Sequence, residues 1–541
     1  MPADRVLVNA RVLTMAGDRA AEAVAIADGR VLAVGSDAEI RALAGPGTVV
    51  EDLSGATVMP GLIDAHNHLL MTGQILQQVQ LYDCRSIDDI LDRVRTAVEK
   101  APPGTWILGR GWDESLLAEK RHPNRHDLDR VAPDHPVVLH RVWNRLVANS
   151  RAIELAGISR ETPDPPADQP YAGGFERDAE GEPTGLFRDR AKELISSAVP
   201  AMGLDDLVSA IETACREYNR LGLTAVSEPG LSPEQMRAFH EAELRGVLTV
   251  RTAMSIAGWG FGAQKDDALI RDRLANVGVM GGFGDDLLWI DGVKLMPDGG
   301  AGDRTAKMYD PYEGETENRG TWTVPPDDLV GHIQWAHEHG YAMDIHTCGD
   351  EAQDVAVAAF GRAQETCPNL RLRHRVHHAY LPTDRALTTM ARHQIPAVVS
   401  NPFLWSLGES YITSLGRERA SRMMPMRTYL NRGVPLAGSS DSPVATHNPW
   451  IGIASAISRT TVQGTELGPD ERLTPDEALQ MYTTGGAFVI HREATLGMLE
   501  PGKHADLIIL DCDPRERTPA ELVGIEARAT MVGGQWVHDA R

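Results

Sequence analysis

The chain reads VMPGLIDAHNH over residues 58–68, and this segment gives the strongest indication of the fold. A short apolar run ends in an H-x-H pair formed by His66 and His68. Because successive side chains of a strand point to opposite faces, the two imidazoles face the same way and can bind one metal ion. An H-x-H pair alone often arises by chance, but the apolar run before this pair makes it a stronger signal. The motif predicts a metal site at the end of a buried strand.

The middle of the chain alternates between strand-like and helix-like stretches, as repeated βα units do. Helices are expected over residues 207–221 and 329–339. Strands are expected over residues 224–226, 247–254, 287–294, 341–346 and 434–437. The pattern indicates a barrel of βα units, in which catalytic groups lie at the carboxyl ends of the strands.

Both ends of the chain read as β-structure. Near the start, apolar runs flank Asp28-Gly29, a dipeptide that is typical of tight hairpins. Near the end, an apolar run over residues 505–510 is followed by a second hairpin around Gly533-Gly534. We predict one β-sandwich that is made from both termini, residues 1–59 and 490–541.

Residues from about 74 to 201 fit the βα alternation less well. They include the Pro-rich stretch 162–166. We predict that this segment is an insertion subdomain within a barrel that spans residues 60–489.

The composition excludes several classes of function. The 541 residues include 53 Lys and Arg against 76 Asp and Glu, which gives a net charge of -23. An acidic chain is poorly suited to nucleic acid or to anionic membranes, because both need a basic surface. The 42% of hydrophobic residues supports a packed core.

The cysteines argue for a reducing compartment. None of them forms a C-x-x-C pair and their number is odd, so a disulfide framework or a zinc knuckle is not expected. The first residues lack the apolar segment of a signal peptide, and no apolar run is long enough to span a bilayer. We therefore expect a cytoplasmic protein. The five cysteines are Cys84, Cys215, Cys348, Cys367 and Cys512.

Six stretches, taken together, resemble the amidohydrolase superfamily and in particular its YtcJ-like branch, to which N-substituted formamide deformylase belongs. The resemblance runs over almost the full chain. It implies an α/β fold with a TIM-like (β/α)8 barrel, a β-sandwich from both termini, and one or two divalent metal ions. The stretches are VMPGLIDAHNH (58–68), GRGWDE (109–114), KLMPDG (294–299), RTA (304–306), HTCGD (346–350) and GSSDSP (438–443).

The resemblance also implies a set of metal ligands. An ordinary lysine is a cation and has no lone pair to offer a metal. The resemblance implies that Lys294 instead forms a carbamate with carbon dioxide, which would bridge two ions. The alternative is a lysine that holds a substrate carboxylate or an internal ion pair, with a single ion in the site. The implied ligands are His66, His68, Lys294, His346, His378 and Asp441.

One of these ligands has an alternative at the neighbouring position. The family pattern places the ligand directly before an alanine, which selects His378 before Ala379. His377 is the alternative, and on a strand it would point to the other face and be structural. Histidine with carboxylate suits Zn²⁺, although manganese, iron, cobalt and nickel accept the same donors.

The catalytic candidates follow from the same motifs. In the family, the residue at Asp441 binds metal and takes the proton of the attacking water; a helix cap is its structural alternative. His346 or Arg304 would stabilise the oxyanion. Their structural alternatives are a hydrogen-bonded core histidine for His346 and a loop-ordering salt bridge for Arg304.

Candidates for substrate contacts are weaker. Trp112 and Glu114 would line the pocket or shape a loop. Asn144 stands where related sequences often have a histidine, which predicts substrate contacts that differ from those of the formamide-cleaving relatives. Four aromatic residues are candidate pocket walls, with core packing as the alternative: Trp259, Phe261, Phe403 and Trp405.

We therefore predict a hydrolase that uses metal-activated hydroxide to cleave a non-peptide C–N bond in a linear amide, an N-acyl or N-formyl amine, with Asp441 as proton shuttle. Ester, carbamate or cyclic amide cleavage would use the same residues. Lys294 weighs against a deaminase, and the complete ligand set weighs against a non-catalytic binding relative. The substrate is a small molecule, and the family implies a homodimer.

Overall fold

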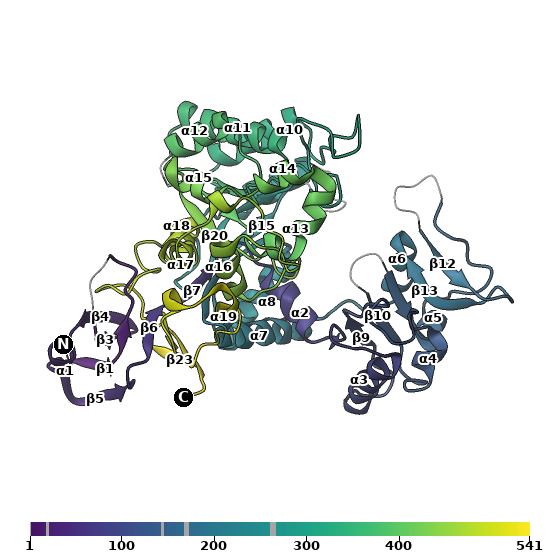
Figure 1. Cartoon of the computed structure of the whole chain (residues 1–541), viewed down its shortest axis with the longest axis horizontal. Helices are drawn as coiled ribbons and strands as arrows, with labels where there is room; N and C mark the ends of the chain where they lie inside the picture. Colours follow the sequence, from purple (N-terminus) through teal and green to yellow (C-terminus); the bar gives the residue numbers. More distant parts are fainter. Residues whose placement is uncertain (1, 18–20, 142–144, 167–172, 260–266, 370) are drawn as a thin grey trace. The chain divides into compact units, whose positions relative to one another are not determined.

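A computed structural model describes residues 2–541 except 18–20, 142–144, 167–172, 260–266 and 370 (Figure 1). The sequence candidates Asn144 and Phe261 lie outside these described residues. The chain divides into two compact units. One is Gln74–Ala210, and the other joins Met1–Gly73 to Ile211–Arg541. Within the described residues, no helix is both long and apolar enough to cross a bilayer.

Eight parallel strands form the central sheet of the larger unit. It starts and ends at β7 and β20, and the barrel closes between them because the Ala65 N–H donates to the Gly438 carbonyl at 3.1 Å. The predicted TIM-like barrel is confirmed. The strands are β7 (Leu62–Asp64), β14 (Leu223–Leu231), β15 (Arg251–Ala257), β16 (Leu288–Leu295), β17 (Met343–His346), β18 (Arg375–His377), β19 (Ala397–Val399) and β20 (Leu436–Gly438).

Helices connect these strands, as the alternation predicts. Two of them, α7 and α10, lie where the sequence predicts helices. The helices are α2 (Leu69–Leu76), α7 (Leu204–Arg220), α8 (Pro233–Leu244), α9 (Asp267–Val277), α10 (Pro326–Glu338), α11 (Asp350–Thr366), α12 (Asp384–His393), α13 (Pro402–Leu415), α14 (Arg417–Ser421), α15 (Met426–Asn431), α16 (Pro449–Ser458), α17 (Pro475–Met481) and α18 (Thr484–Val489).

The expected strand over residues 247–254 is wrong at its start. The N–H groups of Val247 and Leu248 both donate to the Ala242 carbonyl, at 3.0 and 3.2 Å. These two residues therefore provide hydrogen bonds for a carbonyl group at the end of α8, and the strand begins only at Arg251. Apolar side chains at a helix end and in a strand look alike in sequence, so the pattern does not mark this boundary.

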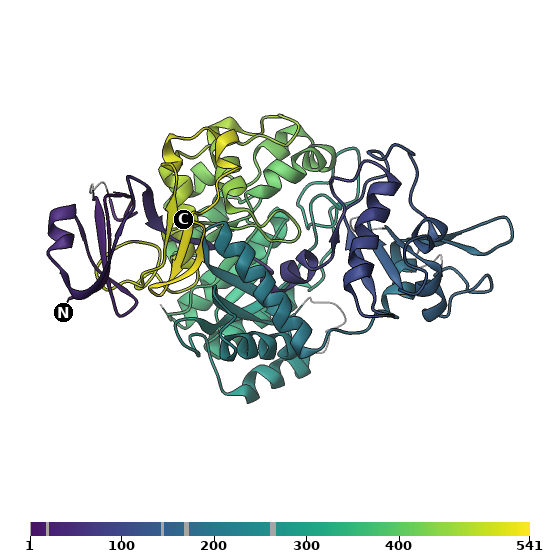
Figure 2. The same cartoon turned by 90° about the horizontal axis from the view of Figure 1, so that it is seen from below.

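A β-sandwich packs beside the barrel within the same unit. Its first sheet has the order β4-β3-β1-β5 and its second the order β2-β6-β21-β22-β23, so the second sheet joins N-terminal and C-terminal segments. Figure 2 shows the C-terminal strands in yellow beside the barrel. The strands are β1 (Ala3–Val8), β2 (Arg11–Val12), β3 (Ala23–Ala27), β4 (Arg30–Gly35), β5 (Ala44–Asp52), β6 (Thr57–Pro60), β21 (Leu507–Leu510), β22 (Ala529–Val532) and β23 (Gln535–Asp539).

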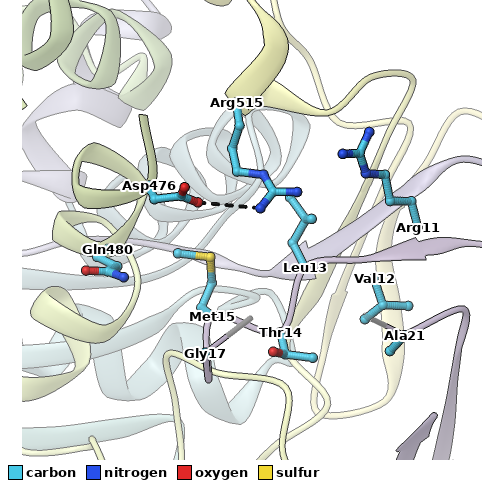
Figure 3. A pocket seen from close by; sticks show the side chains of 10 residues that line it. All are labelled: Arg11, Val12, Leu13, Thr14, Met15, Gly17, Ala21, Asp476, Gln480 and Arg515. Atoms are coloured by element: carbon cyan, nitrogen blue, oxygen red, sulfur yellow. Dashed lines mark ion pairs between the residues drawn. The ribbon is translucent and has the colours of Figure 1, made fainter. Parts of the chain in front are cut away.

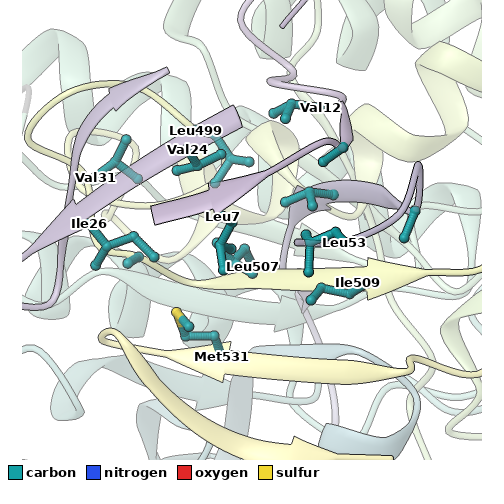
Figure 4. Packing of buried hydrophobic residues seen from close by; sticks show 14 of the residues in the cluster. Leu7, Val12, Val24, Ile26, Val31, Leu53, Leu499, Leu507, Ile509 and Met531 are labelled. Carbon is teal, nitrogen blue, oxygen red and sulfur yellow. The ribbon is translucent and has the colours of Figure 1, made fainter. Parts of the chain in front are cut away.

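The sandwich core draws on both chain ends. Leu7 and Val24 of the first sheet pack in one buried cluster with Leu507 and Met531 of the second (Figure 4). A buried ion pair then ties the sandwich to the barrel: Arg251 at the start of β15 donates to Asp506 at 2.6 Å, and each side chain is 5% exposed. Breaking such a pair on one side leaves an uncompensated buried charge.

The smaller unit, Gln74–Ala210, has its own sheet and its own core. The sheet order is β12-β13-β11-β10-β9-β8. Val137 and Leu139 pack on one face with Trp112, whereas Val138 packs on the other with Phe187, as the two-residue period of a strand requires. Its elements are β8 (Val79–Gln80), α3 (Ile87–Lys100), β9 (Ile107–Arg110), α4 (Arg125–Asp129), β10 (Val137–His140), β11 (Arg145–Ala148), α5 (Ser150–Leu155), β12 (Gly174–Arg177), β13 (Pro183–Arg188) and α6 (Lys192–Ser196).

Candidate metal centre

The H-x-H pair and Asp441 meet at the barrel seam between β7 and β20. Asp441 Oδ1 lies 3.1 Å from His66 Nε2 and 3.2 Å from His68 Nε2. The backbone holds them there, since the Asp441 N–H donates to the His66 carbonyl at 2.8 Å and the His68 N–H to the Ser442 carbonyl at 2.9 Å. We call His66, His68 and Asp441 the seam group; their ligand atoms lie within 4.8 Å of one another.

A second group of ligand atoms lies at the ends of β17 and β18. His346, Cys348 and His378 also have ligand atoms within 4.8 Å of one another, and we call them the β17–β18 group. The rings of His346 and His378 are 4.5 Å apart between centroids. The two groups are neighbours, because the His66 and His378 rings are 5.1 Å apart.

Lys294 ends in the same region. Its side chain is 2% exposed, and among the described residues its Nζ has no hydrogen-bond partner. Burial lowers the pKa of Lys294 to about 8, against the opposing effect of the Asp441 and Asp344 charges. After burial, its positive charge is the next cause that lowers the pKa values of His66 and His346, one residue from each group. A buried amine without a partner, beside two sets of ligand atoms, fits a lysine that takes part in metal binding.

The electrostatics suit a cation. Burial lowers the pKa of His346 to about 4 and the pKa values of His66 and His378 well below their usual range. Burial opposes ionisation of Asp441, but His66 and His68 outweigh it and hold the pKa of Asp441 well below its usual range. Neutral imidazoles beside an ionised carboxylate are the protonation states that bind a metal.

His377 does not belong to either ligand group but lies behind the seam group. Its Nδ1 contacts His66 Nδ1, and its Nε2 is 3.3 Å from Asp344 Oδ1. A carboxylate only accepts, so the His377 proton is on Nε2 and Nδ1 accepts from His66. His66 then carries its proton on Nδ1 and turns its free Nε2 toward Asp441. His377 is fully buried beside the ligands, and thus supports His66.

Asp344 is itself anchored. It forms an ion pair with the fully buried Arg375, which also pairs with Asp291. Burial raises the pKa of Asp344, yet the Arg375 charge and His377 hold it well below its usual range. A charged carboxylate is therefore available behind His377 at neutral pH, as the tautomer assignment requires.

Two of the predicted metal ligands have backbone angles in the left-handed region. His378 has φ 70° and Asp441 has φ 51°. For residues other than glycine this costs about 1–2 kcal/mol each and occurs often at functional sites. Ala379, next to His378, is also left-handed at 47°, and its carbonyl is held by the Tyr429 hydroxyl at 2.9 Å. The backbone turns sharply in order to present these side chains.

Other predicted site residues lie elsewhere. Arg304 forms an ion pair with Glu315 and donates to the Thr413 carbonyl at 3.2 Å, which is the loop-ordering arrangement. Trp112 is fully buried in the core of the smaller unit. Glu114 in that unit pairs with Arg141 at 2.5 Å. Their side chains are occupied by these contacts.

Of the aromatic candidates that the structure describes, one lies beside a ligand group and two make other contacts. Phe403 is 4% exposed and stacks on His378 at 6.0 Å with nearly parallel rings, so it lies against the β17–β18 group. Trp259 stacks on His332 at 4.3 Å and donates to Asp267 at 2.9 Å. Trp405 is half-buried on α13, and its carbonyl accepts from Val462 at 2.8 Å.

Three buried residues of the site were missed by sequence reasoning. Cys348 is in the β17–β18 group, and its signal was available, because His346-x-Cys348 repeats the spacing of His66-x-His68. Asp64 clamps the seam by accepting from the N–H groups of His66 and Ser440, at 3.2 and 3.0 Å. Asp344 had no local signal, since its partner Arg375 is 31 positions away.

A separate pocket of about 450 Å³ opens between the sandwich and α17 (Figure 3). Arg515 and Asp476 form an ion pair of 3.6 Å in its lining. Arg11, also in the lining, is paired with Asp513 at 2.9 Å. This pocket shares no residue with either ligand group, and the arginines named above already have acidic partners. We therefore do not assign the active site to this pocket.

A parallel βα barrel with histidine and aspartate ligands at its strand ends is the architecture of metal-dependent hydrolases. Residues 49–538 match the model of the amidohydrolase family. The chain therefore belongs to the amidohydrolase family and is a metal-dependent hydrolase that acts on C–N bonds.

Similar proteins agree with this assignment. The chain is 32% identical to the amidohydrolase YtcJ of Bacillus subtilis (strain 168), over 97% of each chain. It is 30% identical to N-substituted formamide deformylase of Arthrobacter pascens, over 98% of this chain and 97% of the relative. The crystal structure of a metal-dependent hydrolase from Pyrococcus furiosus superposes with a TM-score of 0.77 at 29% identity, covering 95% of this chain and 100% of that one.

Proposed function

We propose that the protein hydrolyses a linear amide, an N-acyl or N-formyl amine of small size. The observation that carries this is the position of Asp441, whose carboxylate lies at hydrogen-bonding distance from His66 and His68 in a buried barrel mouth. The similarity to a formamide deformylase supports the amide over other acyl compounds.

The two groups divide the metal-binding work in this proposal. The seam group would hold one divalent ion, and His346 with His378 a second. Lys294, as a carbamate formed with carbon dioxide, would supply oxygens to both. Zn²⁺ is the first candidate, and manganese, iron, cobalt and nickel suit the same donors. When bound, such an ion lowers the pKa of a coordinated water to about 7 and polarises a carbonyl oxygen.

Asp441 moves the proton. Its pKa is held well below the usual range, so it is ionised and can accept a proton from the attacking water. It then returns that proton to the leaving nitrogen, because an amine leaves poorly as an anion. His346 serves as a ligand rather than a proton donor, since its Nε2 hydrogen bonds to the Gly299 carbonyl at 3.1 Å.

Phe403 would form an apolar wall of the substrate site, because it stacks on His378. In this proposal Arg304 orders its loop and takes no part in catalysis. We also expect the active protein to be a cytoplasmic homodimer, an expectation that rests on the family and on the sequence.

The test combines metal analysis with a substrate panel. Elemental analysis of protein that has not met a chelator is expected to find one or two divalent ions per chain. N-formyl and N-acyl amines are expected to be cleaved faster than matched esters, carbamates and cyclic amides. Faster cleavage of the ester or the cyclic amide would overturn the substrate class. Protein that binds no metal would overturn the mechanism as well.

A further inference from the structure

We infer that Cys348 is a thiolate ligand of the β17–β18 group, so that the ion beside His346 and His378 has a sulfur donor. This inference rests on the proposed function, because it concerns the same centre. It adds a ligand type that the oxygen and nitrogen donors of the proposal do not include. It also predicts which metals this half of the centre prefers.

The position of Cys348 is the first argument. Cys348 is not in a disulfide, and the residue is 3% exposed. Its ligand atom lies within 4.8 Å of those of His346 and His378, which are the only partners in this group among the described residues. Three donors around one point, on the turns after two adjacent strands, form a site of the kind that holds a catalytic ion with an open position.

The loop that carries Cys348 is fixed. The fully buried Asp298 accepts from the backbone N–H groups of Cys348 and Gly349, at 3.4 and 2.8 Å. The same carboxylate accepts from the Lys307 N–H at 2.9 Å. These bonds tie the turn after β17 to the loop after β16, so the thiol stays beside the two imidazoles.

The histidine tautomers leave the correct lone pairs free. The Gly299 carbonyl accepts from His346 Nε2, which leaves Nδ1 as the donor atom toward an ion. Ser400 Oγ lies 3.2 Å from His378 Nδ1, which leaves Nε2 free on the other side of the ring. Each imidazole thus has one nitrogen occupied by the protein and one available.

A second, independent observation is the amine of Lys294. It is buried and has no hydrogen-bond partner among the described residues, and the charge of a Cys348 thiolate would raise its pKa. A polar atom that is buried without a partner needs a ligand or an ion nearby. Cys348 and Lys294 therefore lie next to the same space.

Binding of a divalent ion to Cys348 requires no further reactant. Binding of a divalent ion forms one sulfur–metal bond, breaks the S–H bond of Cys348, and releases one proton to solvent. Sulfur is a soft donor, so a site of two imidazoles and a thiolate prefers zinc, cobalt or cadmium over magnesium or manganese. The seam group, with two imidazoles and a carboxylate, lacks this selectivity.

Cobalt absorption tests the ligand directly. Metal-free full-length protein is titrated with Co²⁺, and a sulfur-to-cobalt charge-transfer band is expected in the near ultraviolet. In Cys348→Ser the band is expected to vanish, and the affinity for one Co²⁺ to fall by on the order of 100-fold, while binding at the seam group persists. Cys215→Ser is the matched control, because Cys215 is another free buried thiol of the same unit and belongs to neither group.

The outcomes separate this inference from the proposed function. Wild-type protein that binds Co²⁺ without a sulfur band, or a Cys348→Ser variant that keeps the band, overturns the thiolate ligand and leaves the hydrolase intact. Failure of the wild-type protein to bind any metal overturns both. Cadmium-113 NMR of the wild-type protein gives a second readout that needs no variant, since a thiolate ligand moves the resonance strongly downfield.

Discussion

The two ligand groups are supported in different ways. In the seam group, side chains hold side chains: His377 holds His66, Asp344 holds His377, and Arg375 holds Asp344. In the β17–β18 group, one buried carboxylate, that of Asp298, holds the backbone of the turn. The first arrangement sets the tautomer and orientation of a ring. In the second, the buried carboxylate sets the position of a loop, and each ring is held by one neutral partner, the Gly299 carbonyl for His346 and Ser400 for His378.

This difference matters for what each group can tolerate. A side-chain relay fails when any member changes, because the proton positions depend on the whole chain of bonds. A backbone anchor fails only when the anchor is lost. The seam group is therefore expected to be the more sensitive half of the centre, and the following experiments examine that expectation.

The largest effect is expected from Asp441→Asn. The left-handed φ of 51° is readily adopted by asparagine, so the backbone should stay in place. The amide cannot accept the proton of water, and kcat is expected to fall by about 10²–10⁴-fold. Steady-state kinetics with an N-formyl amine measures the loss. A variant that keeps more than a tenth of the wild-type kcat would remove Asp441 from the proton transfer.

Asp344→Asn tests the relay behind the seam group. It removes the charge that fixes the proton on His377 Nε2, and ion binding at the seam group is expected to weaken by about 10–100-fold. Loss of the Arg375 partner also costs stability, on the order of 3 kcal/mol. Isothermal titration with Co²⁺ measures the affinity and thermal unfolding measures the stability.

The matched variant is Asp298→Asn. It is expected to lower the unfolding temperature but to leave the seam-group affinity near the wild-type value. If both variants weakened the same ion equally, the contrast between a relay and a backbone anchor would be lost.

Acid should destabilise the metal-free protein through its buried histidines. Burial lowers the pKa of His346 in the folded protein to about 4, below its ordinary value of 6.5. Between pH 6.5 and about 4, the histidine is protonated in the unfolded chain but stays neutral in the folded protein. Its contribution to the free energy of unfolding is therefore complete above pH 6.5 and is lost as the pH falls toward 4. The shift corresponds to about 3 kcal/mol.

Thermal unfolding of chelator-treated protein between pH 7.5 and about 4.5 measures this loss. His346→Gln is expected to show a shallower decline, because one of the titrating groups is gone. An unfolding temperature that stays constant over the whole interval would contradict the neutral, buried state of these histidines.

The smallest effect is expected from Arg304→Ala. Its guanidinium is paired with Glu315, and the two side chains are 33% and 31% exposed. Such a pair contributes at most about 1 kcal/mol, and kcat/KM is expected to change by less than about fivefold. A loss as large as that of Asp441→Asn would return Arg304 to the catalytic residues.

Much of the centre could be predicted because its signals are local. The spacing of His66 and His68, the single lysine at the end of an apolar strand, and the aspartate after a Gly-Ser-Ser turn are all visible within a few residues. Cys348 has the same kind of signal in its spacing from His346. The aromatic pocket residues had no such spacing, and Trp259 proved to be occupied by His332 and Asp267.

Local patterns were enough to predict the barrel, the β-rich ends and the types of ligand, because strand periodicity and residue chemistry are properties of short segments. The folded chain was needed to place His378 in a ligand group and His377 behind His66. It also decided that Arg304 is held by Glu315. These outcomes depend on contacts between residues far apart in the chain, such as the seam bond between Ala65 and Gly438, and no local pattern encodes the distances that closure of the barrel creates.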